Sequence, residues 1–105
     1  MAKKKYNVII SDKAKKMIGN HVRFMAQVNK RAAATKKAEI MVAMRSLSEL
    51  PERFPFFDGE PYITPKTYHK MFIERWYLVL YKIDGDTVYV DYVVDTRQDY
   101  GWLLN

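Results

Sequence analysis

Strand-forming residues are concentrated near the end of the chain, in two β-branched and aromatic runs that flank Asp84-Gly85-Asp86. These runs cover residues 77–83 and 87–94. Gly85 can adopt a positive φ without a Cβ clash, so the pattern predicts a β-hairpin. A shorter run over 68–73 precedes them, and a tight turn at Glu74-Arg75 connects it to the hairpin. The pattern therefore predicts three antiparallel strands in a meander.

The first half of the chain is predicted to contain one short strand and two helices. Residues 6–10 favour a strand, and Ser11 follows as a good N-cap for a helix. Apolar residues then recur at helical spacing over 12–29 and again over 31–50, where a Leu-Pro pair ends the pattern. Because one or two residues separate these segments, we expect an antiparallel helical hairpin.

Residues 51–67 contain all four prolines of the chain, interleaved with aromatic residues. Prolines at this density exclude a helix and disfavour a central strand. The aromatic side chains argue against disorder, because they need burial. We therefore expect an ordered connector that covers the core, and a stacking surface for nucleic-acid bases is the alternative.

Together these elements predict a single α+β domain over residues 1–105. An N-terminal strand is followed by the helical hairpin and then by the three-stranded antiparallel meander. We expect both helices to pack on one face of a small sheet. The length of 105 residues is the usual size of one domain.

The composition excludes several classes of site. The chain has no cysteine, which excludes disulfides, thiolate zinc sites and a thiol nucleophile. It also has no glycine-rich phosphate loop and no local spacing of metal ligands, so we expect no cofactor and no metal. No apolar run approaches the ~20 residues that span a bilayer, and no signal-peptide pattern follows the N-terminal lysines. A cytoplasmic protein without a membrane partner is expected.

The net charge of +6 is unevenly distributed. Residues 1–47 hold twelve Lys and Arg against Asp12 and Glu39, a net charge of +10, whereas residues 48–105 hold six against ten acids, a net charge of −4. A basic half indicates an acidic partner such as nucleic acid, the ribosome or an acidic protein. A solvated lysine-rich helix face is the alternative.

Several short motifs follow one another in a fixed order, and the last of them reads Asp-x-Arg-x-x-Tyr directly after the final predicted strand. They are Tyr6-Asn7-Val8-Ile9-Ile10-Ser11, Leu47-Ser48-Glu49-Leu50-Pro51, Tyr68-His69-Lys70-Met71, Trp76-Tyr77-Leu78-Val79-Leu80-Tyr81 and Val93-Val94-Asp95-Thr96-Arg97-Gln98-Asp99-Tyr100. In this order the chain resembles, over nearly its whole length, the RelE/ParE superfamily of toxins from type II toxin–antitoxin systems.

The resemblance implies a growth-inhibiting toxin of a plasmid-stabilisation or addiction module, neutralised by a cognate antitoxin. RelE-type members cut mRNA in the ribosomal A site, and ParE-type members inhibit DNA gyrase. Both types share one fold, so the target is open between mRNA on the ribosome and gyrase. A different class of function is a catalytically inactive basic binding module of the same fold, which binds nucleic acid or a protein partner.

RNA cleavage of the RelE type needs a general base, a general acid and cations on the phosphate. By the resemblance, the post-strand arginine is Arg97. The C-terminal tyrosine of the RelE site aligns with Leu103, and Tyr100, three residues earlier, is the candidate to replace it. In the enzymatic interpretation His69 transfers a proton, Arg97 holds the scissile phosphate, and Tyr100 stacks on a base or gives a proton. In the other interpretation His69 is a surface residue, and Arg97 pairs with a neighbouring acid or binds a partner.

The non-enzymatic interpretation is preferred, because positions that are cationic in the family are apolar in this chain. Family cations fall on Met71 and Leu78, and we expect these to share one strand face with His69 and Leu80. Missing phosphate-binding cations cost orders of magnitude in rate, although a reduced nuclease stays open. Exposed apolar groups near Leu78, Leu80 and Trp102 are expected to receive an antitoxin segment, and an acidic antitoxin would complement the basic helices.

Overall fold

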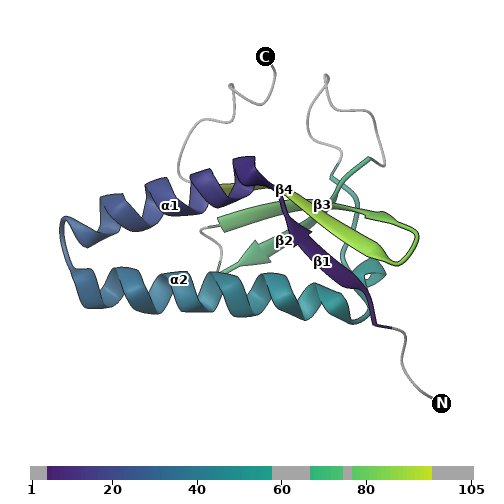
Figure 1. Ribbon diagram of the computed structural model, residues 1–105, viewed down its shortest axis with the longest axis horizontal. Helices are drawn as coiled ribbons and strands as arrows, with labels where there is room; N and C mark the ends of the chain where they lie inside the picture. The colour runs from purple at the N-terminus through teal and green to yellow at the C-terminus, as the bar shows by residue number, and fades with distance from the viewer. Residues whose placement is uncertain (1–4, 58–66, 75–76, 96–105) are drawn as a thin grey trace.

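The computed structural model describes residues 5–57, 67–74 and 77–95, and every structural statement below concerns these residues. A four-stranded sheet packs against two helices (Figure 1). Two short 3₁₀ turns, η1 and η2, follow the second helix. The elements are β1 (Asn7–Ile10), α1 (Asp12–Ala26), α2 (Lys30–Arg45), η1 (Ser46–Ser48), η2 (Pro51–Arg53), β2 (His69–Ile73), β3 (Tyr77–Asp84) and β4 (Thr87–Asp95).

The sheet has the strand order β1-β4-β3-β2. Strands β2, β3 and β4 form the predicted antiparallel meander. Gly85, with a φ of 62°, allows the turn that places Asp84 opposite Thr87. Strand β1 pairs with β4 in parallel, with Ile10 opposite Val90, which makes the sheet mixed. The predicted α+β fold is confirmed, and the parallel pairing of β1 is an addition to it.

Both helices begin at the side-chain caps that polar residues supply. The backbone N–H of Ala14 donates to Ser11 Oγ at 3.0 Å, and that of Ala32 donates to Asn29 Oδ1 at 3.0 Å. Each cap satisfies a donor that has no partner within its helix. The caps therefore fix the helix starts on either side of a three-residue connection.

The second helix is shorter than expected. It ends at Arg45, and the chain then passes through η1 to Leu50, which has a left-handed φ of 47°. Proline disfavours the α-helical region for the residue before it, so Pro51 prevents the helix from continuing through Leu50. The expectation of a continuous helix to Leu50 is therefore wrong.

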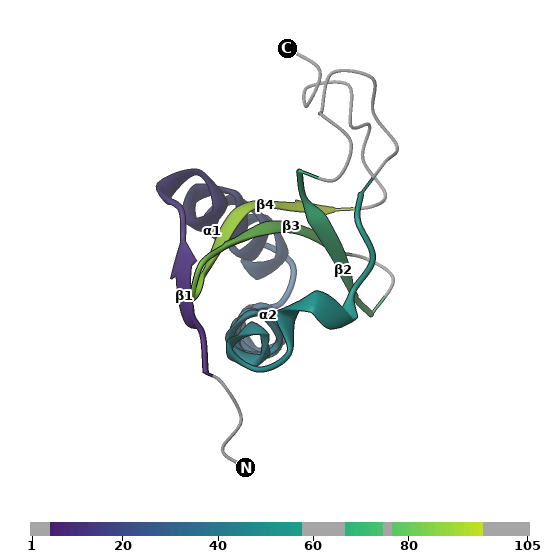
Figure 2. The ribbon, with the colours of Figure 1, turned by 90° about the vertical axis from the view of Figure 1, so that its right-hand side faces the viewer.

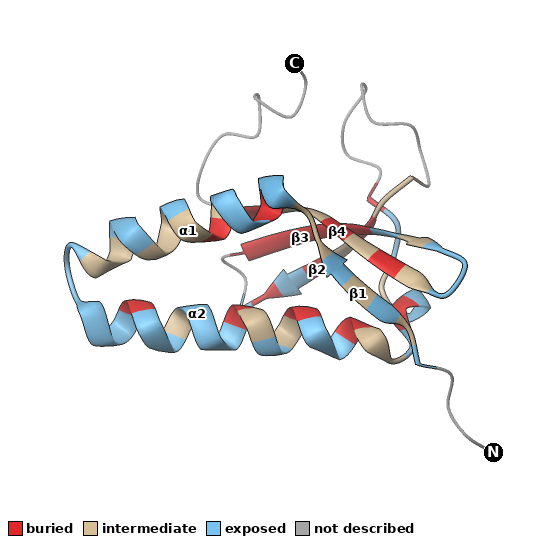
Figure 3. Ribbon diagram, viewed as in Figure 1, coloured by how far each residue is buried: buried red, intermediate tan, exposed pale blue. Residues whose placement is uncertain are grey.

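The main core lies between the helical hairpin and one face of the sheet. Figure 2, which looks along the helices, shows α2 in the hollow of the curved sheet. Buried positions alternate with exposed ones along both helices, whereas residues 77–81 of β3 are all buried because both faces of the strand are covered there (Figure 3). The buried members of this core are Ala14, Ile18, Ile40, Met44, Leu47, Met71, Ile73, Tyr77, Val79, Tyr81, Val88, Val90 and Val93. The predicted packing of both helices on one sheet face is thus confirmed.

Candidate functional site

His69, the first residue of β2, is buried among aromatic rings. Its side chain lies between Phe56, with ring centroids 4.2 Å apart, and Tyr81, with centroids 5.3 Å apart. Both pairs are close to parallel, at interplanar angles of 29° and 15°. His69 Nδ1 is 2.8 Å from the carbonyl oxygen of Phe54. A carbonyl only accepts, so Nδ1 carries the proton and donates it in this bond. His69 therefore joins the connector to the sheet, and the expectation of a surface strand residue is wrong.

His69 also lies on a different sheet face from the apolar positions with which it was grouped by sequence. The antiparallel register places His69 opposite Tyr81, so both side chains lie on the helix-covered face, as does that of Met71. Leu78 and Leu80 alternate with that set and lie on the other face. The expectation that these four positions share one face is therefore wrong.

The face that carries Leu78 and Leu80 is covered. Leu78 is 2% exposed and Leu80 is 0% exposed, and both pack with Phe57, Tyr68 and Tyr92. The hydroxyl of Tyr68 donates to Asp91 Oδ2 at 2.7 Å, and burial together with this carboxylate raises the pKa of Tyr68. The expectation that Leu78 and Leu80 are exposed for an antitoxin is wrong. Trp102 lies outside the described residues.

Arg97 and Tyr100 also lie outside the described residues, so the structure does not place them relative to His69. Strand β4 ends at Asp95, which is 6% exposed. Within the described residues the ring contacts of His69 are to Phe56 and Tyr81, and neither side chain is a cation. Tyr81 donates its hydroxyl to the Pro51 carbonyl at 2.6 Å. The described part of the site is therefore a packed aromatic cluster at the connector.

Two other features, a metal site and a membrane-spanning helix, are absent from the described residues. No group of three His, Cys, Asp or Glu side chains there is arranged to hold a metal ion. In the same residues, no helix is long and apolar enough to cross a bilayer. The described residues do form surface grooves.

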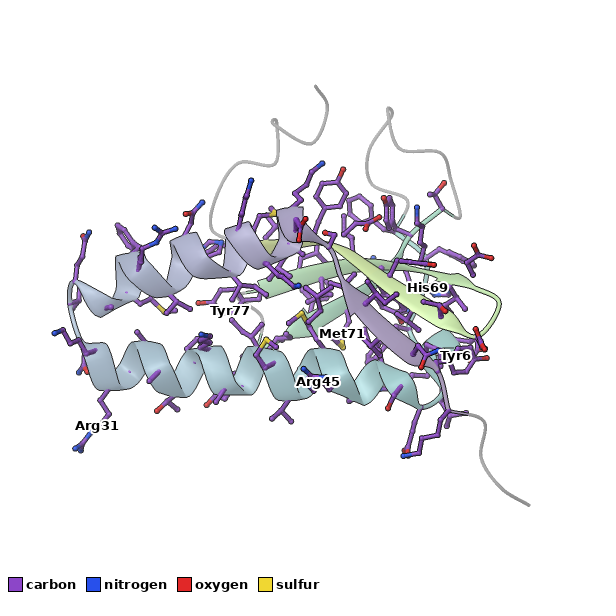
Figure 4. The ribbon with its side chains drawn as sticks, viewed as in Figure 1. Tyr6, Arg31, Arg45, His69, Met71 and Tyr77 are labelled. Carbon is purple, nitrogen blue, oxygen red and sulfur yellow. The ribbon has the colours of Figure 1, made fainter. Side chains whose placement is uncertain are left out.

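One such surface is a groove of about 710 Å³ near the tip of the helical hairpin. Met17, Phe24 and Val28 contribute apolar lining, and Phe24 and Val28 are 71% and 86% exposed. His21 packs edge-on against the ring of Tyr77, with centroids 5.7 Å apart, at the floor of this region. Figure 4 shows Tyr77 and His69 well apart along the sheet. Sequence reasoning missed this groove, although Phe24, on the outer side of the helical pattern, is a signal that could have indicated it.

A family model matches most of this chain, and a solved structure shares its fold. Residues 8–100 match the family model described as the ParE toxin of the type II toxin–antitoxin system, parDE. A solved structure titled "Chromosomal ParDE TA system from P. aeruginosa" is similar with a TM-score of 0.71 and 11% sequence identity, over 87% of this chain and 96% of that chain. At this identity the likeness shows the fold. Comparison with curated proteins gives no match.

Proposed function

Because the chain belongs to the ParE toxin family of type II toxin–antitoxin systems, we propose that it arrests growth by binding DNA gyrase, without cutting RNA. A cognate antitoxin neutralises it. The single observation that carries the choice of gyrase over mRNA is the environment of His69.

A general acid or base must reach the proton that it transfers. His69 is 9% exposed, has aromatic rings against it from Phe56 and Tyr81, and donates its Nδ1 proton to a backbone carbonyl. These contacts stabilise one packed position of the ring. They support a structural role for His69, because a catalytic base would need access to a ribose hydroxyl.

Two strand positions that are cationic in the family are apolar in this chain. Met71, on the same face as His69, is 4% exposed and apolar, and Leu78 is buried on the opposite face. Removing one preorganised donor from a transition-state site costs roughly 10²–10³ in rate. Two missing cations would thus leave a very slow nuclease, which supports inhibition through binding.

Arg97 and Tyr100 keep a role in this proposal. They follow β4 in the sequence, and positions just after the end of a strand are frequent in binding sites. We assign both to contact with the target, in place of phosphate binding and proton transfer.

The test is inducible expression in bacteria with growth, mRNA integrity and plasmid supercoiling followed in parallel. Wild type is compared with Arg97→Ala and with Arg31→Ala, a matched control at an exposed arginine in the first turn of α2. We expect arrest with intact mRNA and altered supercoiling in wild type and in Arg31→Ala. Arg97→Ala should lose the effect, and purified protein should inhibit gyrase in vitro.

Two results would count against the proposal. Early mRNA cleavage that Arg97→Ala abolishes would indicate a nuclease that works with a reduced set of groups. Absence of any arrest would instead support the inactive basic binding module, for which the +10 charge of residues 1–47 is the motivating feature.

A further inference from the structure

The groove of about 710 Å³ near the tip of the helical hairpin has a largely apolar wall along α1. Met17, His21 and Phe24 line it, and their spacing of three or four residues places them on one side of the helix. Val28 continues this wall just past the end of α1. Because Phe24 and Val28 are both exposed, the far end of the groove presents apolar surface that the described fold does not cover.

The other end of the groove is formed by the end of the sheet. Val94 and Asp95, the last two residues of β4, line the groove there together with Tyr77. Residues 96–105 follow Asp95 directly in the sequence, so this ten-residue segment starts from the wall of the groove. The segment after β4 is therefore attached to one end of an open apolar groove.

The segment is long enough to reach the other end. Met17 and Val28 are eleven residues apart, which is about 16 Å at the rise of a helix. An extended chain covers up to about 3.3 Å per residue, so ten residues reach about 33 Å. Any conformation of residues 96–105 from fully extended to helical can thus follow the groove for most of its length.

Residues 96–105 also carry the apolar side chains that such a groove can bury. Trp102, Leu103 and Leu104 are three successive large apolar residues, and left in water they would form an exposed apolar patch. Burying even one side chain of this size favours the buried state by about tenfold or more. Attachment at Asp95 adds to this, because a short linker holds the segment at an effective concentration of about millimolar.

A second copy of the chain fits the groove less well, because the hairpin tip is basic. Arg31 lies at this tip (Figure 4), Lys30 precedes it, and both are exposed. Two tips brought together would place like charges opposite one another. Residues 96–105 contain one base, Arg97, and one acid, Asp99, so they bring no net charge to the tip.

We propose that residues 96–105 dock in the hairpin-tip groove of their own chain, with residues 102–104 against Phe24 and Val28. The groove is then an internal binding site for the segment that follows β4. The apolar wall supplies the contact, and the short attachment makes the contact intramolecular.

Docking has a consequence for Arg97 and Tyr100, which lie between Asp95 and Trp102 in the sequence. With both ends of this stretch held, Arg97 and Tyr100 remain close to the end of the sheet. The inference concerns only the fold of the chain, and it does not depend on gyrase as the target.

The test uses cysteine accessibility, because the chain has no cysteine and a single thiol can be introduced without a competing one. Val28→Cys places the thiol in the groove. Val42→Cys is the matched control, because Val42 is 71% exposed on α2 and is not among the groove-lining residues. Each is made in the whole chain with the native segment and with Trp102→Ser, Leu103→Ser and Leu104→Ser together, the triple-serine segment. Mass spectrometry measures the rate of modification by N-ethylmaleimide.

We expect the thiol of Val28→Cys to react at least about tenfold more slowly with the native segment than with the triple-serine segment, since docking buries it. The thiol of Val42→Cys should react at the same rate with either segment. The protection should persist on about hundredfold dilution, because an intramolecular contact does not depend on protein concentration. Circular dichroism checks that each variant is folded, and Phe24→Cys is the second reporter if Val28→Cys is not.

Three results would overturn the proposal. The first is an equal rate for the groove thiol with either segment. The second is protection that disappears on dilution, which would assign the groove to a second copy. The third is protection that appears only when the product of the adjacent open reading frame is added, which would assign the groove to that partner. The assay uses purified protein and does not depend on toxicity, so its outcome is separate from that of the growth and gyrase tests.

Discussion

Replacing His69 with alanine separates a structural role from a catalytic one. The substitution removes the Nδ1 hydrogen bond to the Phe54 carbonyl and both ring contacts, to Phe56 and Tyr81. A hydrogen bond contributes about 1 kcal/mol net to stability. Each aromatic pair contributes about 0.5–1.5 kcal/mol beyond the area that it buries. The free energy of unfolding should therefore fall by about 2–4 kcal/mol.

Urea unfolding followed by circular dichroism measures this loss. Phe72→Ala is the matched control, because Phe72 lies on the same strand and is 54% exposed, and its effect should stay within about 0.5 kcal/mol. Domains have roughly 5–15 kcal/mol of stability, so most His69→Ala molecules should remain folded and arrest growth when expressed.

The result that would refute a structural role for His69 combines unchanged stability with lost toxicity. If His69→Ala unfolds at the same urea concentration as wild type but no longer arrests growth, then the packing argument fails. His69 would then act through its ring nitrogens on the target, and the nuclease interpretation would regain its proton-transfer group.

Three further predictions concern stability. Tyr81→Phe should lower the free energy of unfolding by about 1–3 kcal/mol, measured with urea, because it leaves the buried Pro51 carbonyl without its donor; an unchanged midpoint would contradict this. Gly19→Ala should raise the free energy of unfolding by up to about 1 kcal/mol, because alanine favours helix and its Cβ would meet only Arg23 Nη2, at 3.9 Å. A lower melting temperature would contradict this. Burial raises the pKa of Tyr68 and Tyr81 above the ordinary 10.0, so these phenols ionise at lower pH in the unfolded chain than in the folded protein. Their contribution to stability is therefore complete below about pH 10, and stability falls as the pH rises further. Phenolate absorbance measures the ionisation, and ionisation of the folded protein near the ordinary pKa would contradict the burial of the two rings.

Local chemistry made much of the fold predictable from sequence. A serine before a helical pattern caps the helix with its own hydroxyl, and a glycine between two strand runs allows a tight turn through its own backbone. Ser11 accordingly caps α1, and Gly85 accordingly forms the hairpin turn. The parallel partner of β1 depends on a contact between residues far apart in sequence, for which no local pattern gives a signal.

The environment of His69 was not predictable, for a related reason. Which residues of two neighbouring strands share a face depends on register, and a slip of one residue reverses every side chain. Between β2 and β3 the chain passes through Glu74, which has a φ of 55°, and sequence does not specify that geometry. The connector adds a second contact, since the N–H of Lys70 donates to the Pro55 carbonyl at 2.9 Å. Together these features turn an apparent surface histidine into a buried one.

The parallel pairing of β1 also bears on when the toxin can form during its synthesis. A ribosome delivers the N-terminus first, at about 5–20 residues per second. The N–H of Asn7 donates to the Asp86 carbonyl, and that of Ser11 donates to the Val90 carbonyl, so β1 pairs only after β4, the last strand of the described residues, has emerged. Contacts between such distant residues form slowly, because the intervening chain must first lose its freedom. The nascent chain therefore lacks a complete sheet until β4 has left the ribosome, which leaves an interval before the active fold can close.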